Sequence, residues 1–328
     1  MTKAKDEFKN RNLIKSFNSE SKYSITKLTQ ILDLSRQTIK KRFDDLVIEK
    51  IISNFTININ PNLLPINLKY VLLEIKTNPN EPQLLENLLK ISQLKILDGV
   101  LGEYSLFALF IFHSSEEYYQ VLSIIDKIMA QSYFKKYQII DTIKVFKTNG
   151  IELKDNKIDP NFEIDSVDYI ILKIMQENQN LKPISTYEIK DIIKEKYKDF
   201  LTKMNRQEVS QSTIHNRIKR LEKKNVILNY ALNFSPKMIG FRGKYLVRIK
   251  PKDPSKYNEI ALNLEKSSFI TDLFRIGEQH GLFAIVRVKK VEDYAEFIKD
   301  LYQSDEIEDT LSSFVLDELK TYTNFVIY

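Results

Sequence analysis

Ser35-Arg36-Gln37-Thr38-Ile39 opens a stretch of this chain that returns 175 positions later as Ser210-Gln211-Ser212-Thr213-Ile214. Further identical residues recur at the same spacing without a gap: Arg42, Leu46, Ile52, Asn54, Asn58, Pro61, Lys69 and Tyr70 return as Arg217, Leu221, Ile227, Asn229, Asn233, Pro236, Lys244 and Tyr245. Gly102-Glu103 returns as Gly277-Glu278, and Glu117-Tyr118 as Asp293-Tyr294 with one residue inserted. The period is far longer than the roughly 20–50 residues of stacked repeats, so each copy is predicted to be a complete module.

The first copy begins with three predicted helices between residues 8 and 50. Leu13, Ile14 and Phe17 share one face of the first helix. The second helix is predicted to be capped by Ser24 and to carry the apolar residues Ile25, Leu28, Ile31 and Leu32. Ser35 caps the third helix, in which Ile39, Phe43 and Leu46 recur at helical spacing. A short helix, a tight turn and a Ser-capped helix are typical of a helix-turn-helix, and residues 51–59 follow as an extended segment.

From residue 68 the pattern changes to strands and helices in alternation. The predicted elements are a strand at 69–75, a helix at 82–94, strands at 95–101 and 104–112, a helix at 116–129 and a strand at 133–146. The order βαββαβ predicts a split, ferredoxin-like sandwich with an antiparallel sheet. Residues 149–161 are polar and contain Gly150 and Pro160, which predicts a linker.

The second copy repeats this plan with one difference. Its first helix is predicted at 167–175, Ser185 and Ser210 cap the next two, and residues 244–319 repeat the strand and helix order. The inward residues are predicted to be Ile170, Ile171 and Ile174 in its first helix, and Ile214, Ile218 and Leu221 in its third. Ser24 and Ser35 are 11 positions apart but Ser185 and Ser210 are 25 apart, so the extra residues 197–206 lengthen the second helix or the turn.

The predicted fold class is α+β, with two winged helix-turn-helix domains alternating with two ferredoxin-like βαββαβ domains. The predicted boundaries are 1–60, 61–148, the linker 149–161, 162–235 and 236–328. A chain of 328 residues is long enough for several such domains, each with its own core.

Composition narrows the classes of function. The chain is 29% charged and 43% hydrophobic, and its longest apolar run, residues 106–112, is too short to span a bilayer. Residues 1–7 lack the apolar core of a signal peptide, which predicts a cytoplasmic protein. With no cysteine there is neither a disulfide nor a thiolate metal site, and the three histidines, His113, His215 and His280, share no ligand spacing. We therefore expect no metal and no cofactor.

Net charge and its distribution favour a polyanionic partner. The formal net charge is +6, and residues 206–224 carry six basic residues against two acidic ones. Residues 305–319, in contrast, carry six acidic residues and no basic one. Positive charge is thus concentrated where the second helix-turn-helix is predicted, as expected for binding to nucleic acid.

Each half of the chain resembles the Lrp/AsnC (feast/famine) transcription regulators. The residues that carry the resemblance in the first half are Leu34-Ser35, Thr38-Ile39, Arg42, Leu46, Ile51-Ile52, Pro61 and Gly102-Glu103-Tyr104. In the second half they are Ser210, Thr213-Ile214, Arg217, Leu221-Glu222, Val226-Ile227, Pro236, Gly240 and Gly277-Glu278. The resemblance implies an N-terminal winged helix-turn-helix and a C-terminal βαββαβ domain for effector binding and self-association in each half. It also implies a nucleoid-associated protein whose partner is double-stranded DNA.

The outward faces of the two third helices are the predicted DNA-binding surfaces. They present Arg36, Gln37, Lys40, Lys41 and Arg42 in the first copy, and Gln211, Ser212, His215, Asn216, Arg217, Lys219 and Arg220 in the second. The first turns of such helices meet base edges in the major groove, where amides pair with adenine and basic groups with guanine or phosphate. Arg42 and Arg217 lie at the edge of the apolar face, so either contact with phosphate or packing across the helices is open.

In relatives, the turn after the second strand helps to line a pocket between paired effector domains, often for an amino acid. The corresponding residues are predicted to be Glu103, Tyr104 and Ser105 in the first half and Glu278, Gln279 and His280 in the second. Relatives usually have Asp where Ser105 stands, and the second turn is predicted to contain an insertion. These residues are also open to a purely structural interpretation as tight turns that require glycine.

Two alternatives belong to other classes of function. The seven glycines include no phosphate-binding run and no nucleophile has a partnering His, so catalysis is not indicated by a motif. The fold resemblance nevertheless extends to siroheme decarboxylases, for which Arg275 and His280 would be the candidate residues. The other alternative is a protein-interaction hub that does not bind DNA. The basic third helices favour a DNA-binding regulator over both.

Overall fold

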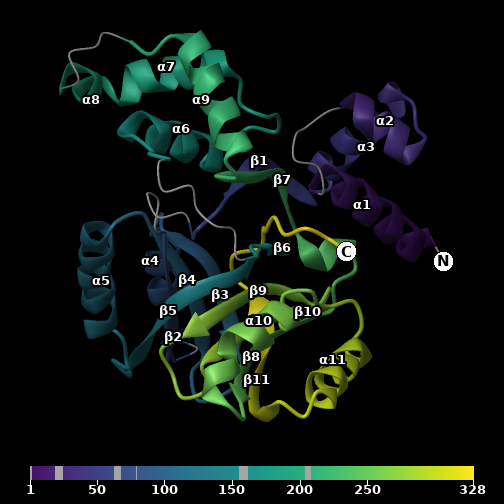
Figure 1. The fold of residues 1–328 in the computed structure, drawn as a ribbon, viewed down its shortest axis with the longest axis vertical. Coiled ribbons are helices and arrows are strands. Elements are labelled where there is room, and N and C mark those ends of the chain that lie inside the picture. The colour runs from purple at the N-terminus through teal and green to yellow at the C-terminus, as the bar shows by residue number, and fades with distance from the viewer. Residues whose placement is uncertain (1, 19–24, 63–67, 79, 155–161, 204–207) are drawn as a thin grey trace. The chain divides into compact units, whose positions relative to one another are not determined.

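The computed structural model describes residues 2–18, 25–62, 68–78, 80–154, 162–203 and 208–328. The chain forms two compact units, each assembled from separate stretches of sequence (Figure 1). The first unit comprises Met1–Pro65, Lys157–Gly240 and Tyr322–Tyr328, and the second comprises Ile66–Asn156 and Phe241–Thr321. Each compact unit contains parts of both copies of the repeat. The division into four sequential domains stays a prediction.

The first unit opens with the helices α1 (Thr2–Asn18), α2 (Ile25–Leu32) and α3 (Arg36–Ile48), followed by strand β1 (Ile52–Ile59). The predicted inner face of α1 is confirmed, because Leu13, Ile14 and Phe17 are all buried. Of the apolar residues predicted for α2, Leu28 is buried, whereas Ile31 is 53% exposed. The predicted cap Ser24 lies outside the described residues.

The second copy contributes α6 (Ser166–Gln176), α7 (Thr186–Lys196), α8 (Lys198–Lys203), α9 (Gln211–Lys223) and β7 (Ile227–Phe234) to the same unit. The extra residues of this copy appear both in α7, which is longer than α2, and in α8, which has no counterpart after α2. Residues 204–207 lie outside the described part. The predicted inward residues of α6 and α9 are buried, which confirms the helical spacing.

Strands β1 and β7 pair with each other in an antiparallel ribbon. The asparagines that recur in the two copies meet across this ribbon: Asn58 Nδ2 donates to Asn229 Oδ1 at 2.8 Å, and Asn233 Nδ2 donates to Asn54 Oδ1 at 3.1 Å. The helices also reach across the copies, since Asn18 of α1 donates to the carbonyl of Leu232 in β7 at 3.2 Å. The two copies are therefore joined within one chain.

The second unit contains two βαββαβ segments. The first segment consists of β2 (Lys69–Ile75), α4 (Pro82–Leu89), β3 (Leu94–Val100), β4 (Leu106–Phe112), α5 (Ser115–Ala130) and β5 (Tyr137–Thr148). The second segment consists of β8 (Gly243–Pro251), α10 (Tyr257–Leu264), β9 (Ile270–Ile276), β10 (Leu282–Val288), α11 (Glu292–Gln303) and β11 (Ile307–Glu318). Two short 3-10 helices, η1 (Pro236–Ile239) and η2 (Pro254–Lys256), lie before β8 and α10.

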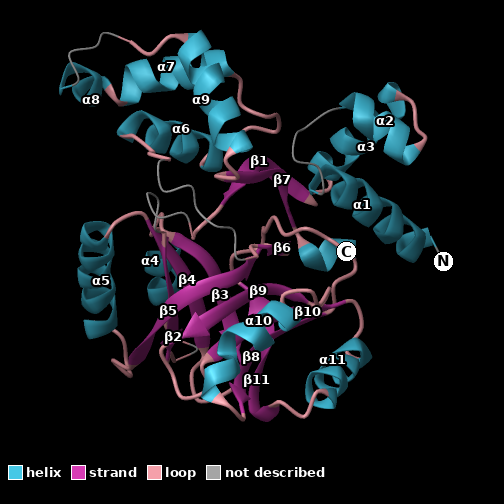
Figure 2. Cartoon of the chain, viewed as in Figure 1, coloured by secondary structure: helices cyan, strands magenta, loops and turns pink. Residues whose placement is uncertain are grey.

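The strands of both segments form one continuous antiparallel arrangement (Figure 2). Their order is β2-β4-β3-β11-β8-β10-β9-β5-β6, and β2 also pairs with β5. Within each segment the last strand pairs with the first, the first with the third and the third with the second. The two segments are joined by the pairs β3–β11 and β5–β9, so eight strands close into a ring that has no free edge among them.

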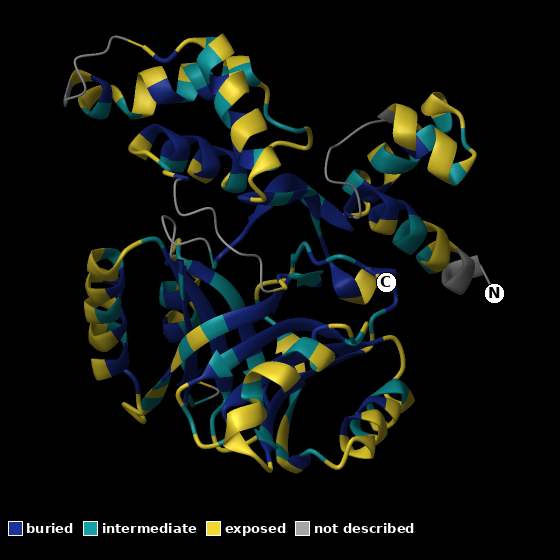
Figure 3. Ribbon diagram, in the orientation of Figure 1, coloured by how far each residue is buried: buried dark blue, intermediate teal, exposed yellow. Residues whose placement is uncertain are grey.

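Each segment has its own apolar core on the helix-covered face of its strands. In the first segment Leu84 and Leu88 of α4 and Val121 and Ile125 of α5 pack onto β2, β3 and β4. In the second segment α10 and α11 pack in the same way onto β8, β9 and β10. Figure 3 shows the strands largely buried and the outer faces of α5 and α11 exposed. The opposite faces of the strands meet the other segment.

The gapless repeat of the sequence shifts by one residue at β2 and β8. Lys69 lies opposite Phe112 on β4, whereas the corresponding position of the second segment, opposite Val288, is occupied by Gly243. Tyr70 therefore corresponds in space to Lys244 rather than to Tyr245. Because side chains alternate along a strand, a shift of one residue places the same residue type on opposite faces of the sheet.

The structure also differs from two predictions about the segments that connect the strands, namely the turn after the second strand of each copy and the linker. Val100 N–H donates to the carbonyl of Ser105, and Ile276 N–H donates to the carbonyl of Gly281, both at 2.9 Å. The two turns therefore have the same length, and the insertion predicted in the second turn is wrong. In the predicted linker, β6 (Ile151–Glu152) pairs with the end of β5, and residues 155–161 lie outside the described part.

Candidate nucleic-acid interface and effector pocket

Helix α3 presents a row of basic and amide side chains to solvent. Its N-cap is Ser35, whose hydroxyl accepts a hydrogen bond from the Thr38 N–H at 3.1 Å. The predicted DNA-binding residues Arg36, Gln37, Lys40 and Lys41 are exposed, and Arg42 is half-buried. On the inner side of α3, Phe43 packs against the rings of Phe17 and Phe55. This aromatic cluster fixes which face of α3 is turned outward.

Helix α9 has a similar start but uses part of its predicted surface internally. Ser210 caps it, and Ser212 Oγ lies 2.9 Å from Ser210 Oγ. Gln211 Nε2 donates to Thr186 Oγ1 on α7 at 2.9 Å, which ties α9 to the helix before it. The exposed remainder of the predicted face is His215, Asn216 and Lys219, and within the described residues these side chains make no hydrogen bond or ion pair.

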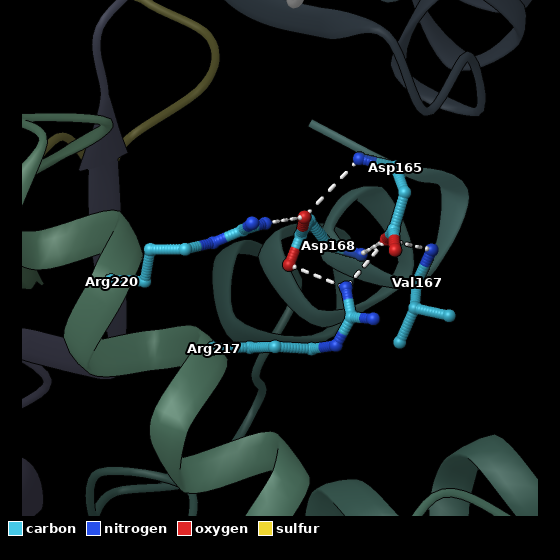
Figure 4. Close-up of polar contacts among 5 residues, drawn as sticks. All are labelled: Asp165, Val167, Asp168, Arg217 and Arg220. Carbon is cyan, nitrogen blue, oxygen red and sulfur yellow. Dashed lines mark hydrogen bonds and ion pairs between the residues drawn. The ribbon is translucent and has the colours of Figure 1, made fainter. Parts of the chain in front are cut away.

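Arg217 and Arg220, both predicted to bind DNA, turn instead toward the N-terminus of α6 (Figure 4). Arg217 Nη1 lies 2.6 Å from Asp165 Oδ1 and 3.0 Å from Asp168 Oδ1. Arg220 donates to the other oxygen of Asp168. The Asp168 carboxylate is fully buried, and it also accepts the backbone N–H of Asp165 at 3.2 Å.

The same cluster caps the N-terminus of α6 and holds α9 against it. Asp165 is the N-cap of α6 and Asp168 the third residue of its first turn, so the two carboxylates form a capping box. Burial works to raise the pKa of Asp165, but hydrogen bonds from Arg217 and from the Asp168 N–H outweigh it and hold that pKa below its usual range. Burial likewise opposes the charge of Arg217, and the two carboxylates outweigh it and raise its pKa.

The first copy lacks this arrangement. The first turn of α1 contains no acidic residue. Arg42, which recurs as Arg217, makes no ion pair with another residue of the described part. The same arginine position therefore has different surroundings in the two copies, and the acidic pair at the start of α6 was the signal in the sequence that distinguishes them.

The two turns predicted to bind an effector meet in one pocket of about 550 Å³ in the second unit. Five of the six predicted residues line it: Glu103, Tyr104, Glu278, Gln279 and His280. Ser105 does not, because its hydroxyl donates to the carbonyl of Thr77 at 3.2 Å. Residues that the sequence analysis did not single out complete the lining, among them Glu74, Gln138, Arg248, Leu311 and Ser312.

The charged groups of this pocket are arranged around Arg248. Its guanidinium lies 2.8 Å from Glu74 Oε2 and 2.9 Å from Glu278 Oε2. Burial opposes the charge of Arg248, but the two carboxylates raise its pKa. Gln138 connects the two turns, since it donates to Glu278 at 2.8 Å and accepts from the Tyr104 hydroxyl at 3.0 Å. The pocket thus combines paired charges with hydrogen-bonding groups from both segments.

The two residues named for the decarboxylase alternative do not share this pocket. His280 is among the lining residues, with Nε2 4.0 Å from Asp309 Oδ2. Arg275 lies outside the lining: its guanidinium stacks on Tyr257 at 3.6 Å and donates to the carbonyl of Gly281 at 2.6 Å. Among the described residues, no cluster of His, Asp and Glu is suited to hold a metal ion. No described helix is long and apolar enough to cross a membrane.

Residues 245–325 match the family model of the Lrp/AsnC ligand-binding domain. The chain carries an Lrp/AsnC ligand-binding domain. This match covers the second βαββαβ segment from within β8 to beyond β11, including the second of the two turns that meet in the pocket.

The chain is similar to proteins named as HTH-type transcriptional regulators. The chain is 29% identical over 115 residues to the HTH-type transcriptional regulator LrpA of Pyrococcus abyssi, which covers 34% of this chain and 79% of LrpA. It is 25% identical over 158 residues to an uncharacterized HTH-type transcriptional regulator of Pyrococcus furiosus, covering 48% of this chain and 95% of that protein. About half of this chain thus accounts for nearly all of that relative.

A solved structure matches nearly the whole chain. The siroheme decarboxylase NirDL aligns with 96% of this chain and 92% of its own, with a TM-score of 0.58 and 10% sequence identity. At this identity the match shows a shared fold. It does not carry decarboxylation to this chain.

Proposed function

We propose that this chain is a sequence-specific, double-stranded-DNA-binding transcription regulator of Lrp/AsnC type. In this proposal α2–α3 and α7–α9 are two helix-turn-helix elements, β1 and β7 are their wings, and the two βαββαβ segments form the effector and assembly domain. The observation that carries the proposal is the exposed face of Arg36, Gln37, Lys40 and Lys41 on a Ser-capped helix. The relatives named as HTH-type transcriptional regulators support it.

The exposed residues suggest how the two helices would share the work of recognition. Gln37 and Asn216 have the bidentate amides that suit adenine, and Arg36 has the guanidinium that suits guanine. Lys40, Lys41 and Lys219 are suited to phosphate contacts, which position a protein on DNA without reading its sequence.

We assign Arg217 and Arg220 to positioning α9 rather than to contacting DNA. Both guanidinium groups are held by the buried Asp168 carboxylate. If either guanidinium left this site to bind phosphate, the buried Asp168 carboxylate would lose one of its counterions. That loss costs free energy of folding.

We further propose that the pocket between the two turns takes a small polar effector, of amino-acid size or similar. Its volume of about 550 Å³ lies in the range of small-molecule sites, and it has both apolar lining from Leu101 and Leu311 and polar groups from both segments. Tyr104 and Gln138 supply hydrogen-bonding groups beside the Arg248 charge cluster.

The salt dependence of DNA affinity tests the proposed function. Each lysine or arginine that neutralises a phosphate releases counterions, so log affinity should fall against log salt by about 0.9 per contact. We expect a steep fall for the intact protein in a fluorescence anisotropy titration of genomic promoter fragments. Lys40→Ala should reduce the slope by about 0.9.

The control is Lys127→Ala, which removes an exposed lysine from α5 in the other unit and should leave the slope unchanged. An affinity that is equal at low and physiological salt would contradict DNA binding. That outcome is the one expected for the protein-interaction hub.

A further inference from the structure

The inner faces of the two βαββαβ segments carry charges at equivalent positions. Phe107 of β4 and Phe283 of β10 stack on each other, with ring centroids 5.3 Å apart and planes 8° from parallel. Glu74 lies opposite Phe107 in the first segment, and Arg248 lies opposite Phe283 in the second. Glu74 and Arg248 therefore occupy the same place in their respective segments, next to the point where the segments meet face to face.

These two equivalent residues form an ion pair with each other. Arg248 Nη2 lies 2.8 Å from Glu74 Oε2, and the two side chains are only 9% and 11% exposed. Because the positions are equivalent, two copies of the same segment paired in this way would bring each residue against itself. A first segment would face glutamate with glutamate, and a second segment would face arginine with arginine.

Two further pairs of equivalent positions lie between the segments, away from the stacked phenylalanines. Asp98 lies opposite Phe107 and Phe274 lies opposite Phe283, so these two positions are equivalent. Tyr70 and Lys244 are equivalent as well, since each follows the first ladder position of its segment. Lys244 Nζ lies 2.6 Å from Asp98 Oδ2, and the Tyr70 ring lies 5.8 Å from that of Phe274.

Each segment thus offers one charged and one aromatic group, and each finds its match on the other segment. Asp98 and Lys244 are 1% and 4% exposed, so water contributes little to stabilising either charge. In a pairing of like segments Asp98 would meet tyrosine and Lys244 would meet phenylalanine. Asp98 would then be buried without the lysine that pairs with it, which is strongly unfavourable. Lys244 would lose its closer carboxylate and keep only Glu318 of its own segment, 3.4 Å away.

We propose that Glu74 and Arg248, together with Asp98 and Lys244, make the two segments selective for each other and exclude pairing with a second copy of the same segment. Selectivity between partners arises from repulsion in the wrong complex as much as from attraction in the right one. The partner that fits the inner face of one segment is therefore the other segment, and the covalent connection within one chain favours pairing there.

Charge reversal in two separate full-length chains tests this proposal. In Glu74→Arg both segments carry arginine at the central position, and in Arg248→Glu both carry glutamate. Each variant alone has like charges face to face. When the two are refolded together, the first segment of each chain finds an opposite charge on the second segment of the other, with Asp98 and Lys244 still matched.

Native mass spectrometry after co-refolding distinguishes the outcomes, since the two chains differ in mass. We expect the 1:1 heterodimer to exceed either homodimer severalfold. If either variant does not fold alone, recovery of folded protein in the mixture, followed by circular dichroism, takes the place of the mass ratio. A mixture with neither heterodimer nor recovered fold would overturn the proposal.

An ion pair within one segment provides the matched control. Lys69 and Asp141 are both in the first segment, with Lys69 Nζ 3.2 Å from Asp141 Oδ1. Lys69→Glu and Asp141→Lys chains that are refolded together should show no excess of heterodimer over homodimer, because this ion pair lies within the first segment. A heterodimer in this mixture as abundant as in the first would show that charge reversal alone causes association, and would equally overturn the proposal.

Discussion

Asp168 is the residue that ties α9 to the start of α6. It is fully buried, and its two oxygens receive Arg217, Arg220 and the N–H of Asp165. A helical wheel of α9 predicts the edge position of Arg217 but not the carboxylate that α6 brings to it. The sequence therefore left contact with phosphate and packing across the helices both open, and the structure supports the second.

We predict that Asp168→Asn destabilises the protein without changing the salt dependence of DNA binding. Removing one partner of a buried ion pair leaves the others uncompensated, and with both arginines partly exposed we expect a loss near the lower end, about 3 kcal/mol. The midpoint of urea unfolding, followed by circular dichroism, measures this loss.

Lys219→Ala is the matched control on the same helix. It should leave the unfolding midpoint unchanged and reduce the salt slope by about 0.9. If Arg217→Ala reduced the salt slope as Lys219→Ala does, and left stability unchanged, Arg217 would be a phosphate contact and the positioning role would be wrong.

At the scale of elements, local features were predictable and boundaries less so. The caps Ser35, Ser185 and Ser210 and the strand Lys69–Ile75 are confirmed, because they depend on residues close together in the sequence. Helix α4 ends at Leu89, five residues before the predicted end, because the chain turns there to begin β3 at Leu94.

What joins the elements could not be predicted from the repeat. The repeat identified Asn54, Asn58, Asn229 and Asn233 as recurring but not as partners, since pairing between β1 and β7 is a contact between residues far apart in the sequence. The polar residues Glu74 and Arg248 within apolar strands were a signal that could have revealed the inner face. The one-residue shift at Tyr70 and Lys244 gave no such signal, because both copies read Lys-Tyr.

We predict that the asparagines of the β1–β7 ribbon are energetically coupled. Asn58 is 3% exposed, donates to Asn229 and accepts from Asn324 Nδ2 at 2.9 Å. Asn58→Ala leaves these buried groups unpaired, which should cost about 1–3 kcal/mol. Asn58→Ala combined with Asn229→Ala should cost less than the sum of the single changes, because the second removes a group that the first left unsatisfied.

A double-mutant cycle in urea unfolding gives this coupling. Asn258→Ala, at an exposed position of α10, is the control and should change stability by less than about 0.5 kcal/mol. Strict additivity of Asn58→Ala and Asn229→Ala would show that the ribbon asparagines act independently.

At the scale of the whole molecule, duplication within one chain changes what symmetry requires. Two separate copies of a module are identical, so a two-fold symmetric dimer of them presents the same face from each copy. Here β1 pairs with β7, β3 with β11 and β5 with β9, so both copies contribute to each unit of a single chain. The two halves are then free to differ, and the contrast between Asp98 and Phe274 is one such difference.

The two proposed recognition helices differ in the same way, which leads to a prediction about the DNA site. A homodimer with identical helices selects palindromic sites whose half-sites lie about one helical turn apart. Helix α3 exposes Arg36, Gln37, Lys40 and Lys41, whereas α9 exposes His215, Asn216 and Lys219. We therefore expect a non-palindromic site, in which Gln37→Ala and Asn216→Ala each relax preference at a different base pair. Each bidentate contact that is lost should cost on the order of 1–3 kcal/mol at its own position, as measured by affinity for every single-base variant of the footprinted site. If both substitutions instead relaxed preference at symmetry-related positions of a palindrome, the two helices would be reading the same sequence, and specialisation of the two copies would be wrong.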